Sequence, residues 1–155
     1  MVIATLAALL LAIGCGSSNG GEITVQTGSL SKAEFIEKAD AICKAARTEF
    51  LAKYTSFVQT HKSDIGKAQK EAALRSEALE TIISPNFEGE IDQISKLGAP
   101  SDYAPEAASF LNTLQQRLDE VHEDPAELNA TLYPFKKAEN VAKAAGLEVC
   151  AESFG

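Results

Sequence analysis

Apolar residues recur every three or four positions between residues 35 and 57, which predicts a long amphipathic helix. The recurring residues are Phe35, Ala39, Ile42, Ala46, Phe50, Tyr54 and Phe57. Ser31 and Glu34 have the spacing of a capping box, and Leu30 and Phe35 have that of a hydrophobic staple. The pattern therefore predicts a helix that starts after Ser31, ends near Thr60 and carries one apolar stripe.

A second periodic segment starts near Asp64 and is interrupted by Pro85. Its apolar positions are Ala68, Ala72, Leu79, Ile82 and Ile83 before the proline, and Phe87, Ile91, Ile94 and Leu97 after it. Because proline breaks the hydrogen-bond pattern of a helix interior, the segment predicts a kinked helix or two abutting helices. Gly98 and Pro100 are expected to end it.

Two further helices are predicted in the last third of the chain. The apolar positions of the third are Ala107, Phe110, Leu111, Leu114, Leu118 and Val121, and those of the fourth are Leu128, Leu132, Phe135, Ala138 and Ala142. Asp124 and Pro125 have the order of an N-cap followed by a first helical residue. Pro134 should distort the fourth helix or separate its first two turns, and Gly146 with Leu147 predicts a Schellman ending.

Four amphipathic helices joined by short turns predict an all-α fold, an antiparallel four-helix bundle over residues 31–155. In such a bundle the last helix ends beside the start of the first. This arrangement would place Cys150, just after the fourth helix, near Cys43 in the first.

The N-terminus has a different composition from the rest. Residues 1–14 are uncharged and largely apolar, and a helix of this length rises roughly 21 Å, too short for a bilayer core of about 30 Å. We therefore predict a signal peptide at 1–14. The stretch Leu11–Cys15 resembles a bacterial lipobox, with Ala12 where leucine is usual, and this resemblance implies a lipid on Cys15. An ordinary cleaved signal peptide is the alternative.

Residues 15–30 are mostly Gly, Ser, Thr, Asn and Gln, which predicts a flexible linker. A short strand over residues 22–26 fits Ile23 and Val25, but the sequence offers it no partner. Together these features predict a domain held by lipid at the extracytoplasmic face of the cell membrane.

The chain contains three cysteines, and assigning Cys15 to lipid leaves an even number. Exported proteins keep disulfides, so we predict a Cys43–Cys150 bond. Two separate buried thiols are the alternative. A catalytic thiol is disfavoured because neither cysteine has a nearby histidine or a glycine-rich turn.

Three stretches carry a resemblance: SKAEFIEKADAICKAA at 31–46, LGAP at 97–100 and AAGLEVC at 144–150. They resemble a group of uncharacterised small exported helical lipoproteins of high-GC Gram-positive bacteria. The group combines a signal peptide or lipobox, a helical domain and one cysteine near each end. The resemblance covers about residues 31–150 and implies no activity.

Charge is unevenly distributed along the chain, whose formal net charge is −8. Residues 22–75 carry 9 basic and 7 acidic groups, whereas residues 76–155 carry 5 basic and 15 acidic groups. The acidic half would repel phosphates and the other half is nearly neutral, so we predict no nucleic-acid partner.

Candidate chemical groups are few. Asp119 and His122 have the i, i+3 spacing seen in di-metal bundles, but the further inward carboxylates of such sites are missing. A second candidate is an acidic cluster of Asp119, Glu120, Glu123, Asp124 and Glu127, which lacks EF-hand spacing. A solvated helix end explains the first, and stabilisation of the fourth helix N-terminus explains part of the second. We therefore predict no metal site, with a weak calcium site in the acidic cluster as the alternative.

Acid–base catalysis also finds little support. Glu88, Glu90 and Asp92 are expected to lack the apolar neighbours that would raise a carboxyl pKa. The sequence has no phosphate-binding glycine loop, no G-x-S-x-G and no haem-attachment motif. We therefore predict no catalytic residue and no cofactor.

The sequence favours a non-enzymatic envelope module that binds a protein or a ligand. The alternative is a carrier of a small apolar ligand, haem or lipid, in the bundle core, and an enzyme is the third hypothesis. For a carrier, the candidate polar groups are Tyr54, Tyr103 and Tyr133.

Overall fold

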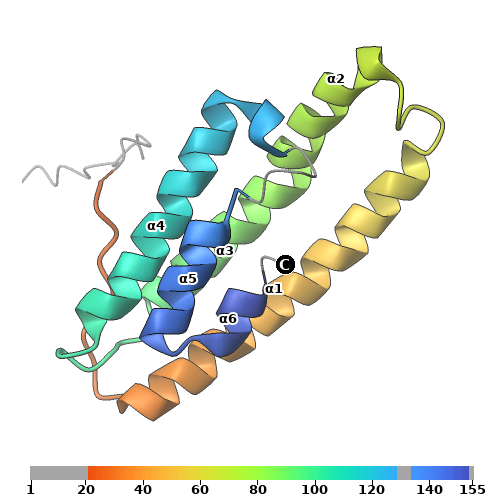
Figure 1. The fold of residues 1–155 in the computed structure, drawn as a ribbon. Coiled ribbons are helices and arrows are strands. Elements are labelled where there is room, and N and C mark those ends of the chain that lie inside the picture. Colours follow the sequence, from red (N-terminus) through yellow and green to blue (C-terminus); the bar gives the residue numbers. More distant parts are fainter. Residues whose placement is uncertain (1–20, 129–133, 154–155) are drawn as a thin grey trace, which may run out of the picture.

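The computed structural model describes residues 21–128 and 134–153, and within them the regular structure is all helical, as predicted (Figure 1). The elements are α1 (Lys32–Thr60), α2 (Ala68–Ala78), the π-helical turn η1 (Leu79–Ile83), α3 (Ser84–Ser95), α4 (Ala104–Glu123), the 3₁₀ turn η2 (Pro125–Leu128), α5 (Lys136–Ala145) and α6 (Glu148–Glu152). The predicted signal peptide and Cys15 lie outside the described residues. Among the helices described here, none is both long enough and apolar enough to span a bilayer.

Helix α1 begins with the predicted capping box. The Ser31 N–H donates to a Glu34 carboxylate oxygen at 2.8 Å, and the Glu34 N–H donates to the Ser31 hydroxyl at 3.3 Å. These bonds satisfy two N–H groups that a helix start leaves without partners. Phe35 is buried in the first turn, and Leu30 packs partly buried against the core.

Helices α2 and α3 abut through η1, in agreement with the predicted interruption at Pro85. The Ser84 N–H donates to the Leu79 carbonyl, a five-residue step that widens the helix directly before the proline. Proline has no N–H and its ring clashes with the preceding turn, so a π-helical turn accommodates it without ending the helix.

The predicted fourth helix is divided near Pro134. Its first turn is the 3₁₀ turn η2, where the Asp124 carboxylate accepts from the Ala126 N–H at 3.0 Å, and α5 starts only at Lys136. Leu132 and Tyr133 lie outside the described residues.

The Schellman ending of α5 is confirmed. Gly146 has a φ of 82°, and its N–H donates to the Lys143 carbonyl at 3.0 Å. The Leu147 N–H donates to the Ala142 carbonyl at 2.9 Å, and the Leu147 side chain is buried. The turn leads into α6, which the sequence did not predict and which carries Cys150.

The core is formed where α3 packs against α1 and α4, α5 packs against α4, and α6 packs against α1 and α5. Helix α4 contributes an almost entirely apolar stripe: Ala104, Ala107, Phe110, Leu111, Leu114, Leu118 and Val121 are buried. Helix α1 contributes unevenly, because its buried residues Phe35, Ala39, Cys43 and Ala46 all lie in its first half.

The second part of the predicted linker over 15–30 makes hydrogen bonds to the helical domain. The Asn112 side chain accepts from the Ile23 N–H at 2.8 Å and donates to the Ile23 carbonyl at 2.7 Å. Gln26 pairs with Ala99 and Ser95 through backbone hydrogen bonds, and Val25 is buried. Residues 23–28 therefore lie against the domain, because the end of α3, the turn after it and an α4 amide supply the partners that the sequence did not reveal.

Candidate functional site

An apolar groove lies between the second half of α1 and the helical segment α2–η1–α3. Its volume is about 390 Å³. Most of the residues that line it are apolar: Phe50, Tyr54, Phe57, Val58, Ile65, Leu74, Ala78, Ile83, Phe87, Leu128, Pro134 and Phe135. The groove thus lies beside the half of α1 that has no buried residue.

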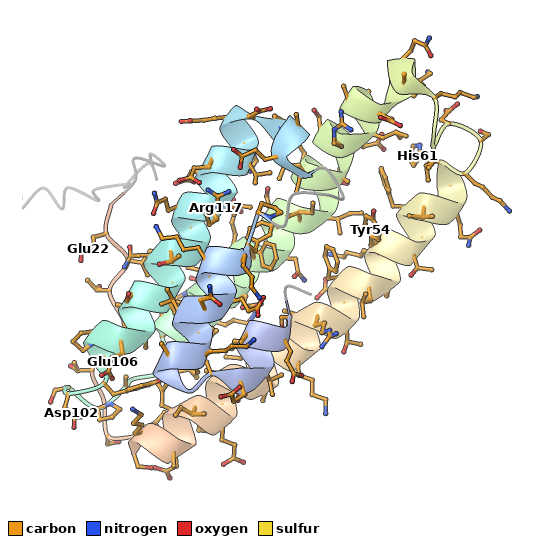
Figure 2. All side chains as sticks on the ribbon, in the orientation of Figure 1. Glu22, Tyr54, His61, Asp102, Glu106 and Arg117 are labelled. Atoms are coloured by element: carbon orange, nitrogen blue, oxygen red, sulfur yellow. A yellow bond between two sulfur atoms is a disulfide. The ribbon has the colours of Figure 1, made fainter. Side chains whose placement is uncertain are left out.

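Aromatic rings form two sides of this groove. On α1, the rings of Phe50 and Tyr54 are 5.6 Å apart and nearly parallel, and Phe57 continues the row at 6.4 Å from Tyr54. Opposite them, Phe87 and Phe135 are 4.8 Å apart. The α1 rings align because residues three and four positions apart share a helix face. Figure 2 shows Tyr54 on the second half of α1. Tyr54 is 43% exposed and Ile65 49%, so part of the lining is open to solvent.

The charged residues that line the groove balance one another. They are Glu71 and Arg75, whose carboxylate and guanidinium are 3.7 Å apart. Next to the groove, His61 packs on the Phe57 ring at 4.4 Å and its Nε2 lies 3.3 Å from a Glu77 carboxylate oxygen. The lining therefore has no net charge to attract an ion.

A second candidate site is buried in the other half of α1. Cys43 and Cys150 form a disulfide with their Cα atoms 5.0 Å apart, as predicted, across 107 positions of the sequence. The Asp40 carboxylate holds α6 beside this bond by accepting from the N–H groups of Val149 at 3.1 Å and Cys150 at 3.2 Å. Burial raises the pKa of Asp40, although both N–H groups act in the opposite direction.

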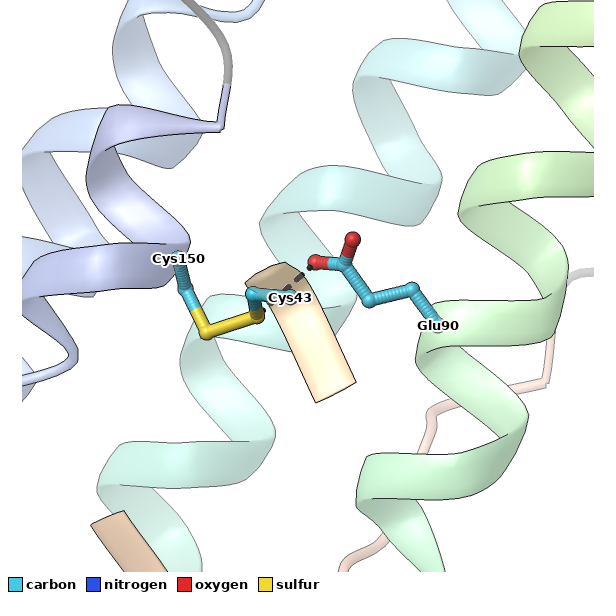
Figure 3. A group of neighbouring side chains, drawn as sticks. All are labelled: Cys43, Glu90 and Cys150. Carbon is cyan, nitrogen blue, oxygen red and sulfur yellow. Dashed lines mark hydrogen bonds between the residues drawn. A yellow bond between two sulfur atoms is a disulfide. The ribbon is translucent and has the colours of Figure 1, made fainter. Parts of the chain in front are cut away.

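Glu90 points from α3 at this disulfide (Figure 3). Its side chain is buried, with one carboxyl oxygen 3.3 Å from Cys43 Sγ. Burial raises the pKa of Glu90 to about 8, so the carboxyl is mostly protonated at neutral pH. A disulfide sulfur carries no hydrogen, so this contact is a hydrogen bond in which the protonated Glu90 donates. The other oxygen, Oε2, has no partner among the residues described.

The expectation that Glu90 lacks apolar neighbours is wrong. Glu90 follows Ile83 by seven positions and Phe87 by three, and it precedes Ile94 by four. These spacings place Glu90 on the same buried helix face as the three apolar residues. Glu88 and Asp92 are exposed, as expected of charged residues off the stripe. The three- and four-residue spacing was the signal that sequence reasoning missed.

The structure separates the groups considered for a metal. Asp119 accepts a hydrogen bond from Gln115 at 2.8 Å, whereas His122 turns to Ser84 and Glu80 on the preceding helical segment. In the acidic cluster, Glu120 and Glu127 pair with Arg117, and Asp124 caps η2.

Within residues 21–128 and 134–153, one group of three side chains could in principle hold a metal ion: Cys43, Glu90 and Cys150, whose possible ligand atoms lie within 4.8 Å of one another. Their disulfide leaves no thiolate to donate to a metal ion. The cluster therefore consists of a disulfide with the Glu90 carboxyl group beside it.

Ser84, His122 and Glu80 have the connectivity of a nucleophile, a base and an orienting acid. Ser84 Oγ is 2.7 Å from His122 Nε2, and His122 Nδ1 is 3.4 Å from a Glu80 oxygen. However, Ser84 is only 4% exposed, and the next residue, Pro85, has no N–H to stabilise an oxyanion. The Ser84–His122 contact therefore joins α3 to α4, and it lacks the exposed nucleophile and the oxyanion-binding N–H of a hydrolase site.

Of the candidate tyrosines, only Tyr54 lines the groove in the described structure. Tyr103 is buried, donates to the Ala145 carbonyl at 2.7 Å, and has a pKa raised to about 12, mainly by burial. It therefore acts in the core. Tyr133 lies outside the described residues.

Comparison of the chain with protein-family models, with curated proteins and with solved structures finds no match in any of the three. The arguments for function therefore rest on the groove and the buried cluster themselves.

Proposed function

We propose that this protein is a non-enzymatic binding module that holds a small, uncharged, apolar molecule in the groove beside α1. The observation that carries the proposal is the groove itself, an aromatic-lined cavity of about 390 Å³. Small-molecule sites are usually concave, mostly apolar clefts of about 300–1,000 Å³ with few polar groups.

The exposed apolar surface of the groove favours an occupant. Tyr54 is 43% exposed and Ile65 is 49% exposed. Both line the groove, so their exposed apolar surface faces a cavity that a ligand can fill. Covering apolar surface yields about 25 cal/mol per Å², so a ligand that fills the groove is stabilised without a specific polar contact. The five aromatic rings favour a flat ring system or an acyl chain.

The balance of charge favours a neutral ligand. Glu71 and Arg75 are the charged lining residues and lie close enough to pair with one another. An anionic or cationic ligand would compete with that pair and would lose hydration on entering the apolar lining.

We further propose that the module is an antiparallel four-helix bundle tethered by lipid on Cys15 at the extracytoplasmic face, after removal of a signal peptide at 1–14. The support is the apolar run before Cys15 and the resemblance to small exported lipoproteins. Because Ile23 already lies against the domain, eight peptide steps separate it from Cys15, at most about 29 Å of chain. The groove would then stay close to a membrane, a source of apolar molecules.

Titration with N-phenyl-1-naphthylamine, an uncharged dye that fluoresces in apolar sites, tests the groove. We expect saturable binding that falls about tenfold in Val58→Trp, because the new ring fills the groove. The matched control is Ala52→Trp, a substitution at an exposed α1 position outside the lining, which should bind as wild type does. Anilinonaphthalene sulfonate, a related dye with a negative charge, should bind more weakly.

Other outcomes would contradict the proposal. Equal dye binding by Val58→Trp and Ala52→Trp would show that the dye binds elsewhere. If the wild-type chain sediments as a dimer that Val58→Trp alone dissociates, then a second copy covers the groove and the ligand proposal is wrong.

A further inference from the structure

We propose that Glu90 is the general base that takes the proton from the Cys43 thiol when the Cys43–Cys150 disulfide closes. Cys43 and Cys150 both start as thiols in every copy of the chain, so this reaction precedes the oxidised state described above. The inference is independent of the groove.

The geometry assigns the proton transfer to one of the two cysteines. A Glu90 carboxyl oxygen lies 3.3 Å from Cys43 Sγ, and Figure 3 shows the carboxyl facing that sulfur rather than Cys150. General bases act within about 2.6–3.2 Å of the atom that loses its proton, and hydrogen bonds to the larger sulfur atom are slightly longer. All three side chains are buried, so water does not readily compete as the base.

Packing gives no reason for an acid at this position. Glu90 is 1% exposed and its Oε2 has no partner in the described part of the chain. A buried polar group without a hydrogen bond destabilises a folded protein, and an apolar residue would fit the stripe of Ile83, Phe87 and Ile94. A chemical role beside the sulfur atoms accounts for keeping the carboxyl.

The reaction requires an oxidant, a small disulfide R–S–S–R of the glutathione class. The Cys150 thiolate attacks it first, which gives a Cys150–S–S–R mixed disulfide and releases R–S⁻. Cys150 is assigned the first attack because Glu90 faces Cys43, the thiol that must lose its proton in the second step.

Cys43 then passes its proton to the Glu90 carboxylate. The Cys43 thiolate attacks Cys150 Sγ, the bond to R breaks, and R–S⁻ leaves and takes a proton from water. Two electrons have moved from the protein thiols to the oxidant. Glu90 is left protonated, the state in which its O–H donates to the disulfide sulfur.

Burial is the cause of the raised pKa of Glu90. Among the described residues, no charged group contributes to that rise. Helix α4 presents an apolar buried face, and the groups brought up by α1 and α6 are Cys43 and Cys150. Asp40, one turn before Cys43, is engaged by the N–H groups of α6. The pH dependence of closure should therefore report Glu90 and the two thiols.

The test is the rate of closure of the reduced, folded chain with glutathione disulfide, sampled by acid quenching and mass spectrometry. Glu90→Gln should slow the loss of the mixed disulfide about 100-fold near neutral pH, the lower end of the usual contribution of a general base. Its rate should keep rising with pH through the range of thiol ionisation, whereas the wild-type rate should level off as Glu90 ionises. Glu88→Gln, the exposed control on α3, should match the wild type.

Equal rates and equal pH profiles for Glu90→Gln and Glu88→Gln would overturn the proposal. If reduced Glu90→Gln does not fold, infrared spectra of the wild-type chain decide the question. Thiols that donate to the carboxylate favour its ionised form, so reduction near neutral pH should remove a protonated-carboxyl band. Retention of that band after reduction would also overturn the proposal.

Discussion

The two halves of α1 carry the same apolar pattern and have opposite surroundings. In the first half, Phe35, Ala39, Cys43 and Ala46 are buried, and α6 is bonded across them through Cys150. In the second half, Phe50, Tyr54 and Phe57 continue the stripe, yet no residue is buried and Tyr54 is 43% exposed.

This difference shows that an amphipathic stripe predicts which face of a helix is apolar, and not whether another element covers it. The pattern of residues 35–57 is continuous, so local sequence gives no sign of the change. Which part of α1 is covered depends on where α6 and the other helices pack against it, and this packing is decided by the tertiary structure. The covered half stabilises the fold, and the uncovered half supplies the aromatic wall of the groove.

Removing the disulfide should give the largest effect, because it releases α6 from the covered half. The bond spans 107 residues, and the lost chain entropy of such a loop corresponds to about 4–5 kcal/mol. The double variant Cys43→Ser with Cys150→Ser should lose about this much unfolding free energy in urea denaturation. Reduced wild-type protein is the matched control, and a loss below about 1 kcal/mol would show that the bond does not hold the covered half together.

Paired truncations on α1 should reproduce the contrast between its halves. Phe35→Ala removes a fully buried ring that meets Tyr103 edge-on at 5.5 Å, and should cost about 3–4 kcal/mol of unfolding free energy. Tyr54→Ala, at an exposed position of the same helix, should cost less than about 1 kcal/mol. Thermal and urea unfolding measure both, and similar costs for the two variants would contradict the division of α1.

The pH dependence of stability gives a smaller effect, which sharpens the role of the covered half. The folded chain holds the Glu90 proton up to about pH 8, whereas the unfolded chain loses it near 4.5. Burying Glu90 therefore carries no cost of neutralising its charge below pH 4.5, and the unfolding free energy falls as pH rises toward 8, by at most about 1.4 kcal/mol per pH unit.

Glu90→Gln should flatten this decline, so its unfolding free energy relative to the wild type should rise with pH across that window. Urea denaturation at a series of pH values checks the slope, with Glu88→Gln as the control that keeps the wild-type decline. Parallel curves for all three proteins would show that Glu90 does not titrate with a raised pKa.

Local signals in the sequence predicted the ends of elements well. The Ser31–Glu34 capping box and the Gly146 Schellman ending each depend on residues within a few positions, and both are present. The cysteine count and the helix order together also predicted the Cys43–Cys150 bond. In contrast, the partners of residues 23–28 come from Ala99 and Asn112, far away in the sequence, and no local pattern identified them.

The candidate sites were only partly predictable for the same reason. Tyr54 was a candidate because it is a polar aromatic residue on the stripe, and the structure places it in the groove. The expectation for Glu90 was wrong because its apolar neighbours Ile83, Phe87 and Ile94 lie one and two turns away along the helix. The burial of Glu90 follows from its helix face, and its position beside sulfur follows from the packing of α3 on α1.

The sequence by itself determined the helices, their caps and the apolar faces that they present, because these depend on interactions within a few residues along the chain. The tertiary structure alone decided which part of α1 is covered, that a groove remains beside the rest, and that a carboxyl lies against the disulfide. Those outcomes depend on contacts between residues more than 40 positions apart, such as Cys43 with Glu90 and Cys150. Contacts of that kind form only when the helices pack together.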